Sequence, residues 1–129
     1  MEKDLIICDT NVIINWLKSE PATISSLHQI GSENIALTSI SFMEILQGAR
    51  NKNELYYLLK TIKRFKVLRF TEAASMKSAI LIEKFVLSHG LQIADAIIAA
   101  IAIDYGLPLF TLNIKDFRFI DEIVLWKNN

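Results

Sequence analysis

Short apolar runs and longer amphipathic segments alternate along this chain. Five runs have the length of a β-strand, and polar or turn residues bound each of them. Between them, apolar residues recur every three or four positions, which is the spacing of one helix face. Strands that alternate with helices are typical of a layered α/β fold with a mainly parallel sheet. The expected strands are Leu5–Cys8, Ile35–Leu37, Val67–Phe70, Leu109–Phe110 and Ile123–Trp126, and the expected helices are Val12–Lys18, Ala22–Ile30, Ser41–Gln47, Glu54–Phe65, Glu72–Ser88 and Ile93–Asp104.

The size and composition of the chain indicate one compact unit. It has 129 residues, 52% of them hydrophobic, and it contains no linker, repeat or low-complexity tract. No uninterrupted apolar run reaches the roughly 20 residues that a membrane helix needs, and the charged start does not resemble a signal peptide. The single cysteine, Cys8, lies in an apolar strand and is expected to be a small buried hydrophobe. We therefore expect a single domain over residues 1–129, in the cytoplasm and without a membrane partner.

The charges are balanced overall but unevenly distributed. Fourteen basic residues match fourteen acidic ones, so no overall field attracts nucleic acid. Between Arg50 and Arg69, however, seven basic residues face a single acid. On the helix expected there, Tyr56, Lys60 and Arg64 fall outside the apolar stripe, a combination suited to base stacking and phosphate contact. The same combination suits a protein interface, a solvated face or partial burial against a neighbouring helix.

Four carboxylates lie at the edges of apolar segments. Asp9 ends the first expected strand, and Asp95 opens a very apolar helix, where the helix dipole alone could explain it. Asp116 follows the strand Leu109–Phe110, so it and Asp9 should reach the same rim of the sheet, where α/β proteins bind ligands. Helical periodicity places Glu44 opposite its apolar neighbours and predicts that it is solvated. Periodicity and spacing alone do not bring the four acids together.

Four segments that contain these acids resemble the motifs of PIN-domain nucleases, in the same order and with similar spacing. The resemblance is greatest to the VapC toxins of bacterial and archaeal toxin–antitoxin pairs. The segments run from Asp9 to Ile14, from Ser41 to Ile45, from Gly90 to Ala100 and from Thr111 to Phe117.

The resemblance implies a three-layer α/β/α sandwich with a central, mainly parallel sheet. It implies that Asp9, Glu44, Asp95 and Asp116 converge as catalytic residues and metal ligands, with Glu44 acting through water. Asn11, Thr111 and Asn113 would support the site, Asn11 by orienting Asp9. The implied cofactor is Mg²⁺ or Mn²⁺, the substrate is RNA, and the partners are a cognate antitoxin and a second copy of the chain.

Other functions stay open on the sequence alone. A phosphohydrolase with Asp9 as its nucleophile would usually carry a second acid two residues later, and this chain has Asn11 there. The two histidines, His28 and His89, stand in no recognisable triad. A PIN nuclease that processes RNA without being a toxin, and a non-catalytic module that binds RNA or protein, are the remaining alternatives.

Overall fold

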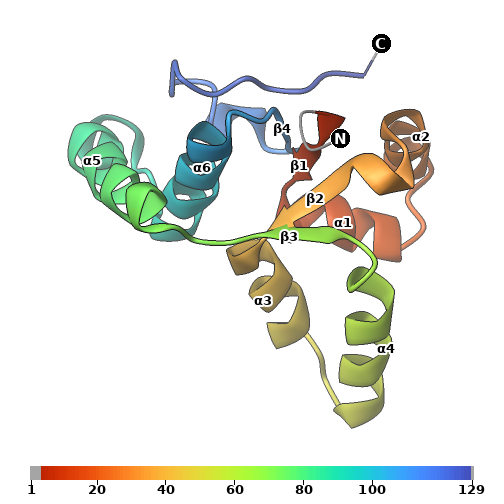
Figure 1. The fold of residues 1–129 in the computed structure, drawn as a ribbon. Helices are drawn as coiled ribbons and strands as arrows, with labels where there is room; N and C mark the ends of the chain where they lie inside the picture. Colours follow the sequence, from red (N-terminus) through yellow and green to blue (C-terminus); the bar gives the residue numbers. More distant parts are fainter. Residues whose placement is uncertain (1–3, 129) are drawn as a thin grey trace.

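The computed structural model describes residues 4–128, and a parallel sheet lies at the centre of the described region (Figure 1). Its strands are β1 (Ile6–Cys8), β2 (Ile35–Thr38), β3 (Lys66–Leu68) and β4 (Leu109–Phe110), in the order β3-β2-β1-β4. In the register, Ile7 lies opposite Ala36 on one side and Leu109 on the other. The chain builds outward from β1 to β3 and then returns to place β4 on the other side of β1. The strand order therefore reverses between β1 and β4, which is where such sheets usually bind ligands.

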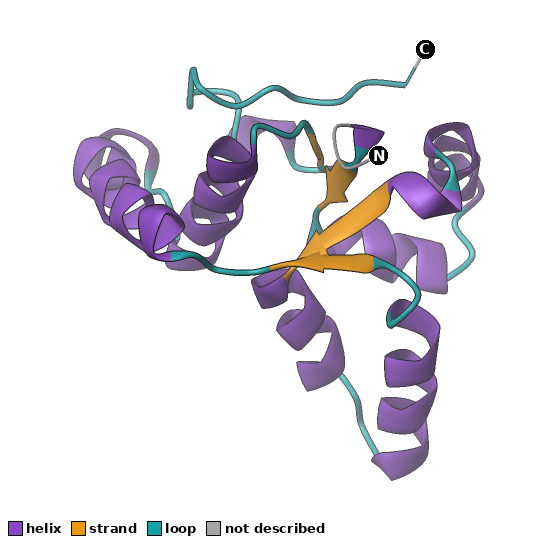
Figure 2. Cartoon of the chain, viewed as in Figure 1, coloured by secondary structure: helices purple, strands orange, loops and turns teal. Residues whose placement is uncertain are grey.

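Helices cover both faces of the sheet (Figures 1 and 2). Successive strand residues point to opposite faces, so Ile7 joins one core cluster and Cys8 joins the other. The first cluster is closed by α5 (Glu72–His89) and α6 (Ile93–Tyr105), and the second includes residues of α1 (Thr10–Leu17) and α2 (Pro21–Ile30). Two cores on either side of one sheet confirm the expected α/β/α sandwich. Cys8 is fully buried, as expected.

Polar side chains placed just before several helices cap their first turns. Asp9 caps α1 by accepting a hydrogen bond from the backbone of Thr10, and Thr38 caps α3 (Ser39–Gln47) through the backbone of Ser41. Asn51 caps α4 (Lys52–Ile62) and Thr71 caps α5 in the same way. Each cap satisfies a backbone N–H that the helix itself leaves unpaired. The carboxyl ends of β1 and β2 are thereby joined tightly to the helices that carry the candidate site residues.

The expected strand Ile123–Trp126 is not a strand, and this prediction was wrong. Leu125 forms only an isolated parallel bridge with Leu109, through backbone hydrogen bonds from Leu109 to Val124 and from Trp126 to Leu109. β4 is two residues long, and its first residue, Leu109, makes this bridge. Figure 1 draws this C-terminal segment as an extended chain in blue.

The expected helix Glu54–Phe65 corresponds to α4 (Lys52–Ile62). Neighbouring elements bury its apolar stripe over only about half of its length. Ile62 and Phe65 are buried, but Leu55 and Leu59, one to two turns earlier, are 41% and 42% exposed. α4 packs against α3, and the two helices project together from the sheet (Figure 1). The outer half of α4 therefore presents apolar surface next to its basic residues. No helix within residues 4–128 is long and apolar enough to cross a membrane.

Candidate active site

Asp9 is the first residue after β1 and lies at the point where the strand order reverses. Its side chain is only 5% exposed, and both of its carboxylate oxygens accept hydrogen bonds. The backbone N–H of Thr10 donates to Oδ1 at 2.8 Å, and the Thr111 hydroxyl donates to Oδ2 at 2.8 Å. Thr111 follows β4 directly, so the neighbouring strands β1 and β4 hold this carboxylate between them.

The surroundings of Asp9 raise the pKa of its carboxyl group above the ordinary value. Burial is the largest cause that raises the pKa of Asp9, and the negative charges of Glu44 and Asp116 raise it further. The hydrogen bonds from Thr111 and Thr10 oppose this rise, because they stabilise the ionised form and lower the pKa of Asp9. A carboxylate in this position would gain from a positive charge beside it.

Asp95 lies in the first turn of α6 and is affected by the same group of acids. Burial raises the pKa of Asp95 to about 6, and the charges of Asp9, Asp116 and Glu44 contribute to the rise. These repulsions show that the fold brings Asp9, Glu44 and Asp116 within electrostatic range of Asp95. The position of Asp95 thus reflects more than the favourable dipole of its helix.

Glu44 does not point into open solvent, so the prediction from helical periodicity was wrong. Glu44 is partly buried, and its Oε1 accepts a hydrogen bond from the Thr10 hydroxyl at 2.6 Å. Thr10 is on α1, 34 residues earlier in the chain. Helix periodicity could not indicate this contact, because periodicity reports only which face of α3 a residue occupies.

Thr111 contacts Asp9 directly, whereas the Asn11 side chain contacts the backbone of Leu112. The Thr111 hydroxyl donates to Asp9 and accepts a hydrogen bond from the Asn113 backbone at 3.1 Å. The Asn11 side chain accepts from the backbone of Leu112 at 3.3 Å, so its contact ties α1 to the segment after β4 and not to Asp9. Asp116 ends the short 3-10 helix Ile114–Asp116 and is exposed.

Three hydroxyl residues near the acids were missed by the sequence analysis. The Thr10 hydroxyl contacts Glu44, the Ser41 hydroxyl contacts Thr10, and the Thr38 hydroxyl contacts Ser41. A signal for two of them was present, since Thr10 follows Asp9 directly and Ser41 precedes Glu44 by three positions. Such residues commonly cap helices, so nothing in the pattern marked them as parts of the site.

The donor chemistry of the four acids fits a hard divalent cation, although they are not gathered as a finished metal site. Among residues 4–128, no group of three or more histidine, cysteine or acidic side chains already has the spacing to hold a metal ion. All four donors are carboxylates, the ligand type that Mg²⁺ prefers in proteins. A cation would relieve the repulsion that raises the pKa values of Asp9 and Asp95.

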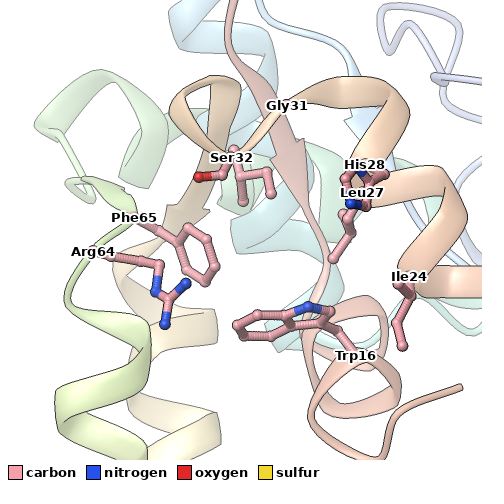
Figure 3. Close-up of a pocket in the computed structure, with 9 residues that line it drawn as sticks. Trp16, Ile24, Leu27, His28, Gly31, Ser32, Arg64 and Phe65 are labelled. Carbon is pink, nitrogen blue, oxygen red and sulfur yellow. The ribbon is translucent and has the colours of Figure 1, made fainter.

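Tyr56 and Lys60 line one surface hollow, whereas Arg64 lines a different pocket. Tyr56 and Lys60 line a small hollow of about 120 Å³ on α4. Arg64 instead lies over the ring of Trp16, 5.5 Å from its centroid, and its Nε donates to the backbone of Thr61. Figure 3 shows it in a separate pocket of about 250 Å³ between α1, α2 and the end of α4. Of the three residues, Tyr56 and Lys60 share a surface hollow.

A comparison with protein families identifies the fold. The family model described as "PIN domain" matches residues 6–123. The chain belongs to the PIN domain family. PIN domains are generally nucleases that use divalent metal ions, which agrees with the donor chemistry of the four acids. No curated protein matches this PIN domain in a sequence search.

Solved structures of similar fold come from toxin–antitoxin complexes. A toxin–antitoxin complex from Klebsiella pneumoniae is similar at 25% identity and a TM-score of 0.78, covering 92% of this chain and 95% of that chain. DNA-bound VapBC from Salmonella typhimurium is similar at 25% identity and a TM-score of 0.79, covering 95% and 96%. VapBC2 from Rickettsia felis, bound to a promoter DNA fragment, has 24% identity and a TM-score of 0.80, covering 97% and 99%. The two likenesses at 25% identity support a VapC-type PIN domain, and the likeness to the Rickettsia felis structure shows the shared fold.

Replacing Thr111 with valine tests how Asp9 is held. Thr111→Val keeps the shape of the side chain but removes the donor to Asp9, so we expect a loss of about 2 kcal/mol in unfolding free energy near neutral pH. Because the hydrogen bond lowers the pKa of Asp9, its stabilisation is present when Asp9 is ionised and is lost as the pH falls. Urea unfolding at several pH values measures the effect. Thr111→Ser is the control and should retain stability; an equal loss in both variants would contradict the role of the hydroxyl.

Replacing Asp95 with asparagine tests the repulsion among the acids. The pKa of Asp95 is about 6 in the folded PIN domain, against an ordinary value of 3.8, so the folded state binds more protons between these pH values. Unfolding free energy should therefore fall as pH rises from about 4 to about 6. An asparagine side chain cannot ionise, so we expect Asp95→Asn to stabilise the metal-free protein by about 1 kcal/mol above pH ~7, after allowing for the partial exposure of the side chain.

Thermal or urea unfolding in EDTA measures this difference. The stabilisation by Asp95→Asn should vanish as the pH falls to about 4 and below, where Asp95 becomes protonated in both states. A variant that is less stable than the wild type at neutral pH, with no recovery on acidification, would show that Asp95 is not under repulsion.

Proposed function

We propose that this PIN domain is a metal-dependent endoribonuclease and the toxin of a toxin–antitoxin pair. The observation that carries the proposal is that Asp9, at the carboxyl end of β1, lies close enough to Glu44, Asp95 and Asp116 for their charges to act on one another. Membership of the PIN domain family supports nuclease chemistry, and similarity to toxin–antitoxin complexes supports the toxin role. The choice of RNA as substrate is part of the proposal.

In this proposal Asp9 and Asp95 bind Mg²⁺ or Mn²⁺ directly, Asp116 binds directly or through water, and Glu44 binds through water or orients the attacking water. The bound cation would lower the pKa of a water molecule and offset the charge that develops on the phosphate. Thr111 and the backbone of Thr10 fix the direction of the Asp9 oxygens, so this ligand needs little reorganisation. Hydrolysis would leave a 5′-phosphate and a 3′-hydroxyl.

The exposed face of α4 is the proposed surface for RNA. Tyr56 is 69% exposed and shares a hollow with Lys60 and Lys63. An aromatic ring can stack on an unpaired base, and the two ammonium groups can contact backbone phosphates. Arg64 is held over Trp16 and is therefore a weaker candidate for a phosphate contact.

A groove of about 380 Å³ between α1, α3 and α4 is the proposed site for the antitoxin. Ile14, Leu17 and Leu58 are part of its apolar lining, and Glu44 also lines it. An antitoxin segment could place apolar side chains in the groove and extend a basic side chain to the carboxylates, which would block them. A second copy of the chain, forming a homodimer, also belongs to the proposal.

Cleavage of purified cellular RNA tests the nuclease activity. The wild type should cut RNA with Mg²⁺ and stop in EDTA, and end sequencing should find 5′-phosphates at the cut sites. Asp9→Asn and Asp95→Asn should each reduce cleavage by more than about 100-fold, since even residues that only support a metal ligand cost up to that amount. Glu33→Gln, an acid outside the four, is the control and should cleave normally.

Undiminished cleavage in EDTA, or in either aspartate variant, would contradict the metal role of these acids. Cleavage of DNA in place of RNA would contradict the proposed substrate and leave the nuclease site intact.

The toxin role predicts a protein inhibitor encoded by a short reading frame beside the gene. We expect its product to copurify with this PIN domain and to stop RNA cleavage. Leu17→Asp places a charge in the apolar lining of the groove and should weaken the complex by about 1–3 kcal/mol, measured by titration calorimetry. Leu87→Asp, on the 98% exposed Leu87 of α5, is the control and should leave the affinity unchanged. Equal affinity for both variants would place the inhibitor elsewhere.

A further inference from the structure

Three hydroxyl groups form a continuous chain that ends on Glu44. Thr38 Oγ1 lies 3.2 Å from Ser41 Oγ, Ser41 Oγ lies 2.8 Å from Thr10 Oγ1, and Thr10 Oγ1 lies 2.6 Å from Glu44 Oε1. Thr38 and Ser41 are fully buried. This series of hydroxyl groups joins the end of β2, the first turn of α3 and the first residue of α1. No buried side-chain polar atom in residues 4–128 lacks a hydrogen-bond partner. We call Thr38, Ser41 and Thr10 the hydroxyl chain.

The Glu44 carboxylate sets the direction of the hydrogen bonds in the hydroxyl chain. A carboxylate can only accept, so the Thr10 hydroxyl must donate its one hydrogen to Glu44. Ser41 then donates to Thr10, and Thr38 donates to Ser41. Thr38 in turn accepts from the backbone N–H of Ser41. Each hydroxyl hydrogen is used once, and all of them point towards Glu44.

Helix capping accounts for only part of this arrangement. Thr38 begins α3 by accepting from the Ser41 backbone, which needs no further hydroxyl. α1 begins with Asp9 and the backbone N–H of Thr10, so the Thr10 hydroxyl is not needed there either. The Thr10 hydroxyl is thus left to bond Glu44, and the Ser41 hydroxyl is left to bond Thr10.

We propose that Thr10 and Ser41 are positioning residues that hold the Glu44 carboxylate beside the other three acids, so that Glu44 contributes to binding the divalent cation. A charge-assisted hydrogen bond of 2.6 Å restricts the rotation of a long, flexible side chain. The inference rests on the proposed function where the cation is concerned, whereas the contact between Thr10 and Glu44 can be tested without a cation.

A double-mutant cycle tests the proposal. Its variants are Thr10→Val, Glu44→Ala and both together, with Thr10→Ser to restore the hydroxyl. Thr71→Val is the matched control: the Thr71 hydroxyl donates to Asp104 at 2.7 Å and also caps a helix, but it lies outside the four acids. Thr71→Val should lower the unfolding midpoint and leave Mn²⁺ affinity and RNA cleavage unchanged.

Three quantities are measured for each variant: the unfolding midpoint in EDTA, Mn²⁺ affinity by titration calorimetry, and Mg²⁺-dependent RNA cleavage. Thr10→Val should weaken Mn²⁺ binding or cleavage by about 10- to 100-fold, the usual cost of losing a residue that orients a metal ligand. Thr10→Ser should restore both. On the Glu44→Ala background, Thr10→Val should cause no further loss and a smaller drop in the midpoint.

The outcomes separate the two proposals. Additive effects of Thr10→Val and Glu44→Ala on the midpoint, on affinity or on cleavage would overturn the positioning role, even if the wild type cleaves RNA. Mn²⁺ binding that depends on Thr10 through Glu44, without any RNA cleavage, would overturn the nuclease proposal and support the positioning role. A wild type that binds no Mn²⁺ would overturn both.

Discussion

The hydrogen bond between Thr111 and Asp9 is the contact on which the candidate site depends. It links the first residue after β1 to the first residue after β4, which are 102 positions apart in sequence. An ionised carboxylate buried this deeply would be costly without hydrogen bonds to both oxygens, and the fold supplies them from Thr111 and the Thr10 backbone. The same burial, with the nearby acids, raises the pKa of Asp9. The fold thus maintains a negative group at a cost that a bound cation would offset.

The remaining acids are arranged around this fixed carboxylate by different means. Asp95 is carried by the apolar helix α6, which is anchored in the core, so its backbone position is well defined. Glu44 is on α3 and depends on the Thr10 hydroxyl for its orientation. Asp116 lies in a short exposed 3-10 helix. We therefore expect Asp9 and Asp95 to be the least mobile of the four, which agrees with their proposed role as direct ligands.

Much of the fold could be predicted from the sequence because the hydrophobic pattern is local and regular. Within residues 4–128, the four strands, the six α-helices and the two-sided burial of β1 follow from apolar periodicity and helix-capping residues. The pattern failed at Ile123–Trp126, where strand length depends on the partner strand, and at the outer half of α4, where an apolar stripe stays uncovered. Both errors concern neighbours that a single segment cannot reveal.

The candidate site was less accessible to sequence reasoning, since its contacts join distant positions. Asp9 and Asp95 could be recognised as candidate site residues because each interrupts apolar sequence. Only the ordered motifs suggested that Glu44 belongs with them. The hydrogen bond from Thr10 to Glu44 joins two helices, so the periodicity of either helix does not predict it.

The most direct test of the proposed metal site is anomalous diffraction from crystals grown with Mn²⁺. The account predicts a manganese peak coordinated by oxygens of Asp9 and Asp95; a peak away from these acids, or none at saturating Mn²⁺, would contradict it.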